Sequence, residues 1–191
     1  IGRINTGVMA EETMFPILQG DLMETGKWTD FALTSEIQLF QEVDGEQVPV
    51  PFDASGKYVA EDGEVIYKPQ AMFTLWNDQD ELRFTRSGRF TVNEAGELLT
   101  LNGHRVIGRG GQPIVLDFPF EDVKVNERGE LFDPETGELI LNAAGEPIAL
   151  LISQVDNPYE LVREGNGSFR LEDAEDNSRP VDDLNQIRVS Q

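Results

Sequence analysis

The chain has 191 residues, and its 36 acidic against 15 basic residues give a formal net charge of −21. Binding to nucleic acid or to an anionic membrane surface is not expected, because both require clustered lysine and arginine. The absence of cysteine excludes disulfides, thiolate metal sites and cysteine nucleophiles. We interpret the acidic excess as a solvated surface, with adaptation to a saline or alkaline exterior as the alternative.

The first 40 residues predict short extended pieces separated by turns. Gln19-Gly20 and Thr25-Gly26 are turn signals, and Asp30 precedes apolar residues at 31–33 that suit a buried strand. No apolar run approaches the ~20 residues of a membrane-spanning helix. The chain begins at Ile1 without Met, and we expect it to be the central region of a longer protein.

Residues 34–70 predict two β-hairpins at an edge of the core sheet. Asp44-Gly45 and Asp62-Gly63 each lie between alternating apolar residues, which is a strong hairpin signal. The prolines at 49, 51 and 69 lack the amide that central pairing needs, which favours edge strands. We therefore expect an insertion over residues 34–70 within a core β domain formed by residues 1–33 and 71–191.

Residues 82–107 predict a β-meander. Four apolar residues share one parity and are expected on one face of the sheet: Leu82, Phe84, Phe90 and Val92. Turns at 93–96 and 102–103 then separate the return strands. Asn can bond its own backbone in such turns, and Gly accepts a positive φ without a steric penalty.

One turn unit, Asn/Asp-x-x-Gly, occurs at residues 53–56, 93–96, 126–129 and 142–145. It suits a type I turn followed by a left-handed glycine in a bulged hairpin, and its irregular spacing excludes a solenoid. Together with a buried run at 148–152, these units predict an all-β fold. Antiparallel hairpins and a meander are expected to form a β-sandwich or barrel-like domain with little helix. Residues 172–183 are expected to form a polar acidic loop.

The sequence singles out no catalytic, cofactor-binding or metal-binding residue. His104, the only histidine, follows the Asn102-Gly103 turn and is expected to be exposed. No serine lies in a Gly-x-Ser-x-Gly elbow, and the many carboxylates favour no particular pair. The acidic runs at 78–81 and 173–176 lack the spacing of a calcium loop. We interpret them as solvated loops, with incidental cation binding as the alternative.

Three further features have two interpretations each. Residues 108–111, Gly-Arg-Gly-Gly, favour a flexible linker over a phosphate cradle, because the Lys-Ser/Thr of a P-loop is absent. Arg86 is expected in a buried or half-buried ion pair with a carboxylate rather than in a binding contact. Four aromatic residues are expected in the core rather than on a sugar-binding face: Phe15, Trp28, Phe40 and Trp76.

Residues 84–108 resemble the central segment of the bacterial flagellar hook–basal-body family. That family's pattern is Tyr/Phe-Thr-Arg-x-Gly-x-Phe, then Gly-x-Leu-Val/Leu-Thr and a closing Val-Leu/Ile-Gly. The matching residues here are Phe84-Thr85-Arg86-Ser87-Gly88-Arg89-Phe90, Gly96-Glu97-Leu98-Leu99-Thr100 and Val106-Ile107-Gly108. Shorter matches are Gln19-Gly20-Asp21-Leu22 with Thr25-Gly26, and Asn157-Pro158-Tyr159-Glu160-Leu161. The family's Gly-x-Gly-Phe-Phe run is missing at 35–40, where either the strand has diverged or the match resumes at 73–76.

The resemblance implies a structural subunit of the flagellar rod or hook, closest to the distal-rod type, that assembles into a helical tube and transmits torque. It implies no enzymatic activity and no cofactor. The implied partners are other copies, neighbouring rod or hook subunits and the flagellar type III export apparatus, with a location in the basal body outside the cytoplasm. The family's long terminal helices are expected to be missing, so we expect a monomer in dilute solution without membrane insertion. An extracellular adhesion or carbohydrate-binding module and a hydrolase stay open as alternatives.

Overall fold

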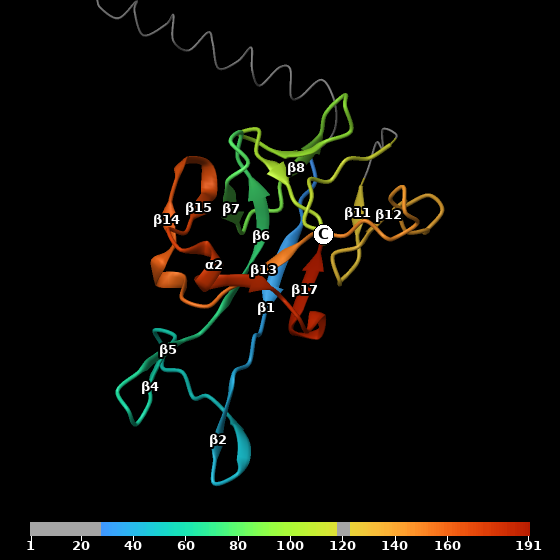
Figure 1. Cartoon of the computed structure of the whole chain (residues 1–191). Helices are drawn as coiled ribbons and strands as arrows, with labels where there is room; N and C mark the ends of the chain where they lie inside the picture. Colours follow the sequence, from blue (N-terminus) through green and yellow to red (C-terminus); the bar gives the residue numbers. More distant parts are fainter. Residues whose placement is uncertain (1–27, 118–122) are drawn as a thin grey trace, which may run out of the picture.

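The computed structural model describes residues 28–117 and 123–191 (Figure 1). These residues form antiparallel β-strands with four short helical turns, which confirms the predicted all-β fold. The turns predicted at residues 19–26 lie outside the described residues, as does Phe15.

A nine-stranded sheet is built around β6 (Gln70–Trp76). On one side, β6 pairs with β7 (Leu82–Thr85). Beyond β7 lie β15 (Ser168–Arg170) and then β14 (Val162–Arg163). The other side is divided. The end of β6 pairs with β10 (Arg105–Val106). Strand β10 pairs in turn with β9 (Leu98–Thr100), and β9 pairs with β8 (Phe90–Val92). The start of β6 pairs with β13 (Ile152–Val155), and β13 pairs with β16 (Ser178–Pro180).

Both faces of β6 are covered by apolar side chains. Ala71, Phe73 and Leu75 point into the main core, whereas Met72 packs in a second cluster on the opposite face. The main core also contains β1 (Ala32–Ser35) and β17 (Ile187–Ser190), which form a two-stranded sheet of their own. This pair packs across the nine-stranded sheet, so the core lies between two β layers.

The chain enters and leaves this core at the same end. Ala32 pairs with Ser190 in the antiparallel β1–β17 sheet, so residues 28–31 lie beside Gln191 (Figure 1). Residues 28–31 are fixed by β8, since the Thr29 amide donates to the Phe90 carbonyl at 2.7 Å. Ile1 lies outside the described residues, so this adjacency applies to residues 28–31.

The four residues expected on one face divide between the two faces. Phe90 and Val92 lie in the main core, whereas Phe84 lies in the second cluster with Leu82 packed against it. The prediction was wrong because it assumed one continuous strand. Residues 86–89 interrupt the pairing between β7 and β8, and parity is not preserved across an irregular segment.

Residues 34–70 contain two hairpins that extend away from the main sheet (Figure 1). The first pairs β2 with β3 across Asp44 and Gly45, whose φ values of 52° and 82° match a type I′ turn: Phe40–Val43 and Glu46–Pro49. The second pairs β4 with β5: Lys57–Val59 and Val65–Tyr67. These strands pair only within their own hairpins rather than with the main sheet. The division of the chain into a core and an insertion stays a prediction.

The Asn/Asp-x-x-Gly unit forms the same turn at all four predicted places. In each, the glycine has a positive φ and its amide donates to the carbonyl of the first residue at 3.0 Å. One such turn joins β11 to β12: Lys124–Val125 and Leu131–Phe132. A fifth copy, residues 77–80, was missed because Asp80, with φ 59°, replaces the glycine. Residues 108–111 also form this turn, so the flexible-linker interpretation was wrong.

The segment 172–183 is more ordered than the predicted acidic loop. It contains the short helix α2 (Ala174–Asn177) and β16. The side chain of the buried Asn177 donates from Nδ2 to the Asn157 backbone carbonyl at 3.1 Å and to Glu160 Oε2 at 2.9 Å. These bonds fix the Asn-Pro turn that begins η1. The 3₁₀ turns are η1, η2 and η3: Pro158–Glu160, Gly165–Gly167 and Leu184–Gln186.

Candidate functional site

His104 is half-buried rather than exposed as predicted. Its backbone amide donates to Thr100 Oγ1 at 3.1 Å, which closes the turn and folds the residue back on the sheet. Burial lowers the pKa of His104, and its Nδ1 has no hydrogen-bond partner among the described residues. No described hydrogen bond joins the imidazole to a serine or a carboxylate, so the geometry of a nucleophilic triad is not formed there.

The acidic runs are used in local structure. Asp80 forms an ion pair with Arg105, and Glu81 Oε1 accepts from Asn77 Nδ2 at 3.1 Å. Asp173 caps α2 by accepting from the Asp176 amide. Over residues 28–117 and 123–191, no three potential metal-ligating side chains converge. None of the helices in these ranges has the length and apolar character needed to cross a bilayer.

Arg86 does not form the predicted ion pair. Its side chain is exposed, and no carboxylate of the described residues pairs with it. A nearby arginine, Arg83, forms such a pair instead, with its side chain 14% exposed and Nε 2.7 Å from Glu164 Oε1. The prediction missed this pair because Glu164 is 81 residues away in the sequence.

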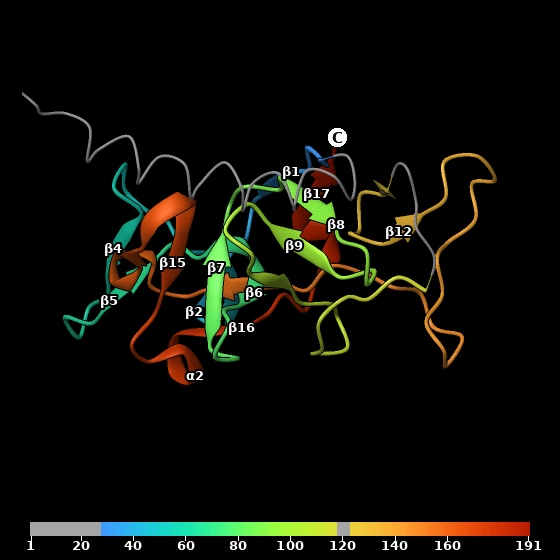
Figure 2. The same ribbon diagram turned by 90° about the horizontal axis from the view of Figure 1, so that it is seen from above.

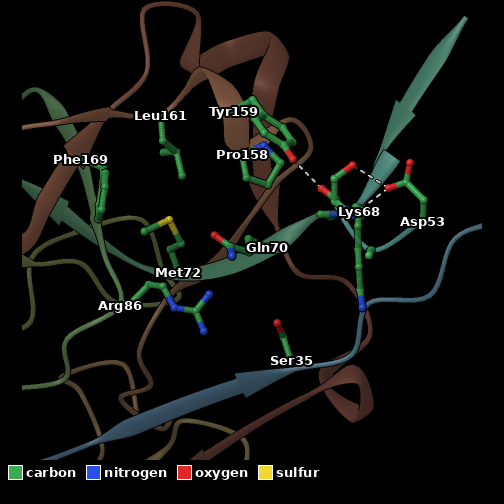
Figure 3. A pocket seen from close by; sticks show the side chains of 14 residues that line it. Ser35, Asp53, Lys68, Gln70, Met72, Arg86, Pro158, Tyr159, Leu161 and Phe169 are labelled. Carbon is green, nitrogen blue, oxygen red and sulfur yellow. Dashed lines mark hydrogen bonds between the residues drawn. The ribbon is translucent and has the colours of Figure 1, made fainter. Parts of the chain in front are cut away.

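A groove of about 630 Å³ lies between the turn at 53–56, the start of β6 and η1 (Figure 3). Its apolar lining comes from Met72, Leu161 and Phe169, which belong to the second hydrophobic cluster or pack against it. Lys68 and Arg86 line the same groove, with Arg86 on the side of Met72 and Lys68 on the side of the 53–56 turn (Figure 3). No local pattern in the sequence pointed to this groove, because its lining extends from residue 35 to residue 169.

Asp53 is the carboxylate of the groove, and its hydrogen bonds are already satisfied. A hydrogen bond from the Ser55 hydroxyl, followed by one from the Lys57 amide, lowers the pKa of Asp53. Lys57 Nζ lies 4.6 Å from the centre of the Tyr159 ring at the wall of the groove. The lining therefore has more positive than negative charge, in a chain whose overall excess is strongly negative.

Tyr159 fixes one wall of the groove to the other. Its hydroxyl donates to the Ser55 carbonyl at 2.5 Å, and its ring lies 5.7 Å from that of Tyr67 on β5. The β4–β5 hairpin is therefore held against η1, although its strands do not join the main sheet.

The aromatic residues expected in the core are only partly buried. Phe40 on β2 is 55% exposed, so its prediction was wrong. Trp28 and Trp76 are half-buried, and arginines lie over their rings: Arg89 over Trp28 at 5.7 Å and Arg105 over Trp76 at 5.5 Å.

Residues 69–132 match the family model described as the flagellar hook protein FlgE/F/G D1 domain. This range contains β6 to β12 and all of the predicted meander. The match to the family model begins at residue 69 and therefore includes residues 73–76. One of the two interpretations of the missing Gly-x-Gly-Phe-Phe run was that the resemblance to the family resumes at these residues.

Similar curated proteins come from flagellar systems. The chain is 30% identical over 117 residues to the flagellar hook-basal body complex protein FlhO of Bacillus subtilis (strain 168), covering 61% of this chain and 35% of FlhO. It is 25% identical to FlhP of the same strain over 130 residues, which cover 65% of this chain and 45% of FlhP. It is 58% identical over 33 residues to the flagellar basal-body rod protein FlgF of Mesorhizobium japonicum (strain LMG 29417 / CECT 9101 / MAFF 303099), covering 17% of this chain and 14% of FlgF.

The matched segments span less than half the length of each of these relatives. The family pattern, the meander and the D1 match coincide on the same strands. Residues 69–132 are therefore similar to the D1 domain of flagellar hook proteins, and the chain is similar over part of its length to flagellar hook–basal-body proteins.

Proposed function

We propose that this chain is a structural subunit of the bacterial flagellar rod or hook, which assembles into a helical tube and transmits torque. The observation that carries the proposal is the D1-domain match, because it falls on the meander rather than on a peripheral loop. In such a subunit the strands supply a rigid body and the surface supplies contacts to neighbouring subunits. The proposal includes the absence of enzymatic activity.

The positions of the described ends support this role. Residues 28–31 and Gln191 lie side by side, so segments continuing in both directions would run side by side from the body. Two chain segments that leave the body side by side can attach it to the wall of a tube. Segments that leave from opposite poles would instead place the body between them along the chain.

The turn chemistry supports stiffness. In the Asn93 turn, Oδ1 accepts from the Glu97 amide at 2.9 Å, and Nδ2 donates to Glu97 Oε2 at 2.9 Å. The same pair of bonds recurs between Asn126 and Glu130 at 3.0 Å each. Each turn is thus closed by backbone and side-chain bonds together, which restricts its motion.

Three finer points belong to the same proposal. We place residues 34–70 as an insertion in the rod-type core, supported by hairpins that pair only internally and by a D1 match that begins at residue 69. We propose export by the flagellar apparatus, which suits a chain without cysteine. We also propose that this chain alone is monomeric in dilute solution, and sedimentation showing stable oligomers at micromolar concentration would contradict that.

The adhesion or carbohydrate-binding alternative has less support. Open aromatic platforms are typical of sugar-binding faces, yet arginines lie over the rings of Trp28 and Trp76. An arginine in that position occupies the ring face that a sugar would need.

The test is deletion and complementation of the full-length gene in its own bacterium. We expect the deletion strain to lose motility and to regain it with the wild-type gene. An epitope inserted beside Gly110, which has open space around it, should appear in purified basal bodies. A tagged and functional protein that is absent from basal bodies would overturn the proposal.

A further inference from the structure

Two cations that line the groove have no ion-pair partner among the described residues. Among the described residues, neither Lys68 nor Arg86 pairs with a carboxylate, and both line the groove (Figure 3). The chain has more than twice as many acidic as basic residues, so partners for these cations are not scarce. Two free cations beside an apolar lining match a ligand that carries both carboxylates and apolar side chains.

The segment 133–147 has this composition. It contains Asp133, Glu135, Glu138 and Glu146 and no basic residue. It also exposes two leucines, Leu139 at 39% and Leu141 at 51%. The bridges of Leu139 to Phe132 and of Leu141 to Pro147 hold the segment in an extended, hairpin-like form.

The two surfaces lie at opposite ends of the molecule. The groove adjoins β4, β5 and β15, whereas the segment 133–147 continues from β12, and both views place these strands far apart (Figures 1 and 2). One copy therefore cannot fill its own groove with this segment. A contact between two different patches at opposite ends leaves one of each free, so it propagates along a filament.

We propose that the groove binds the acidic segment 133–147 of a second copy of this chain. Arg86 and Lys68 pair with its carboxylates, and its exposed leucines cover the half-buried Leu161 and Phe169. A groove of about 630 Å³ holds several side chains, which fits a docked hairpin tip. This inference rests on the proposed function, since it names one of the contacts by which the subunits would assemble.

Cysteine cross-linking tests the contact, because the chain has no cysteine of its own. One copy carries Ala54→Cys at the rim of the groove, and the other carries Ala144→Cys in the 142–145 turn. The matched control is Ala95→Cys, at the same position of the 93–96 turn. At high protein concentration and low salt, we expect the first pair to form disulfide dimers about tenfold faster than the control pair. That ratio corresponds to the contribution of about two exposed ion pairs.

Charge reversal identifies the groups responsible. Arg86→Glu with Lys68→Glu in the groove copy should lower the Ala144→Cys cross-link about tenfold, and Glu135→Lys with Glu138→Lys in the other copy should restore it. Arg128→Glu, an exposed arginine outside the groove, should leave the cross-link unchanged. Raising the salt concentration should reduce the wild-type signal, because exposed pairs are screened.

Equal cross-linking of Ala144→Cys and Ala95→Cys would overturn the inference, as would a reversal without rescue. Incorporation into basal bodies separates this failure from failure of the proposed function. A groove variant that enters basal bodies at the wild-type level would reject the groove contact and leave the subunit role intact. A wild-type protein absent from basal bodies would reject the role itself.

Discussion

Gly88 forms an antiparallel bridge with Phe31, and we expect Gly88→Ala to be strongly destabilising. Its carbonyl accepts from the Phe31 amide at 3.1 Å and from Thr29 Oγ1 at 2.8 Å. A Cβ at this position would overlap the Phe31 carbonyl oxygen and lie 2.6 Å from Phe31 Cβ. Phe31 is buried and packs edge-on against Phe90, with ring centres 6.0 Å apart. The segment therefore has no free space into which to move.

The magnitude follows from two effects. Inserting a methyl group into a close-packed site costs about 1–3 kcal/mol. Displacing the segment weakens two hydrogen bonds, each contributing about 1 kcal/mol. We expect a loss of about 2–4 kcal/mol in the free energy of unfolding. For a chain of this size, that loss lowers Tm by roughly 5–15 °C.

Two glycines serve as controls in urea and thermal unfolding. Gly110 has no heavy atom near an added Cβ and an ordinary φ, so Gly110→Ala should change stability by less than about 0.5 kcal/mol. Gly103 also has open space but a φ of +83°, so Gly103→Ala should cost about 1–2 kcal/mol from backbone conformation alone. If Gly88→Ala were no less stable than Gly110→Ala, the argument from close approach would be refuted.

Three further predictions concern the histidine, a turn and the hairpin wall. Burial holds the pKa of His104 below its ordinary value, so the unfolded chain binds a proton at this residue more readily than the folded chain does. The free energy of unfolding of the wild type should therefore fall as the pH decreases through about 6.5. His104→Gln should flatten the dependence of Tm on pH between about 5.5 and 7.5, and an unchanged slope would contradict this. Asn93→Ala should cost about 1–2 kcal/mol in urea unfolding, because the Glu97 amide loses its acceptor, whereas Glu97→Gln leaves that amide and its acceptor in place and should retain most of that stability; equal losses would count against the turn bond. Tyr159→Phe removes the bond to Ser55 and should speed amide hydrogen exchange in β4 and β5 but not in β9; an unchanged exchange rate in β4 and β5 would show that this bond does not hold the hairpin.

The turns were the part of the fold most readable from the sequence. Each Asn/Asp-x-x-Gly unit is closed by bonds within five residues, so its structure depends little on the rest of the chain. The same reasoning failed at residues 77–80, where Asp80 adopts a positive φ without being glycine. It failed at residues 108–111 for another reason, since composition alone suggested a linker where the backbone forms a closed turn.

The faces of the strands were less predictable. Phe84 and Phe90 have the same parity but lie in different clusters, because residues 86–89 break the alternation. Arg86 is exposed, and Arg83 rather than Arg86 forms the ion pair with a carboxylate. Which side chain meets a carboxylate depends on a strand contributed by residues 168–170 and on the neighbouring Glu164, and no local pattern encodes that neighbour.

By itself, the sequence determined the all-β class and the positions of the Asn/Asp-x-x-Gly turns, because both depend on composition or on bonds between near neighbours, and it carried the resemblance to flagellar hook–basal-body proteins. Only the tertiary structure decided that residues 28–31 lie beside Gln191, and that Lys68 and Arg86 share a groove with Met72 and Phe169. These arrangements join segments that are far apart in the chain. Their geometry is set by strand pairing and by packing on both faces of β6, which emerge only when the whole sheet has formed.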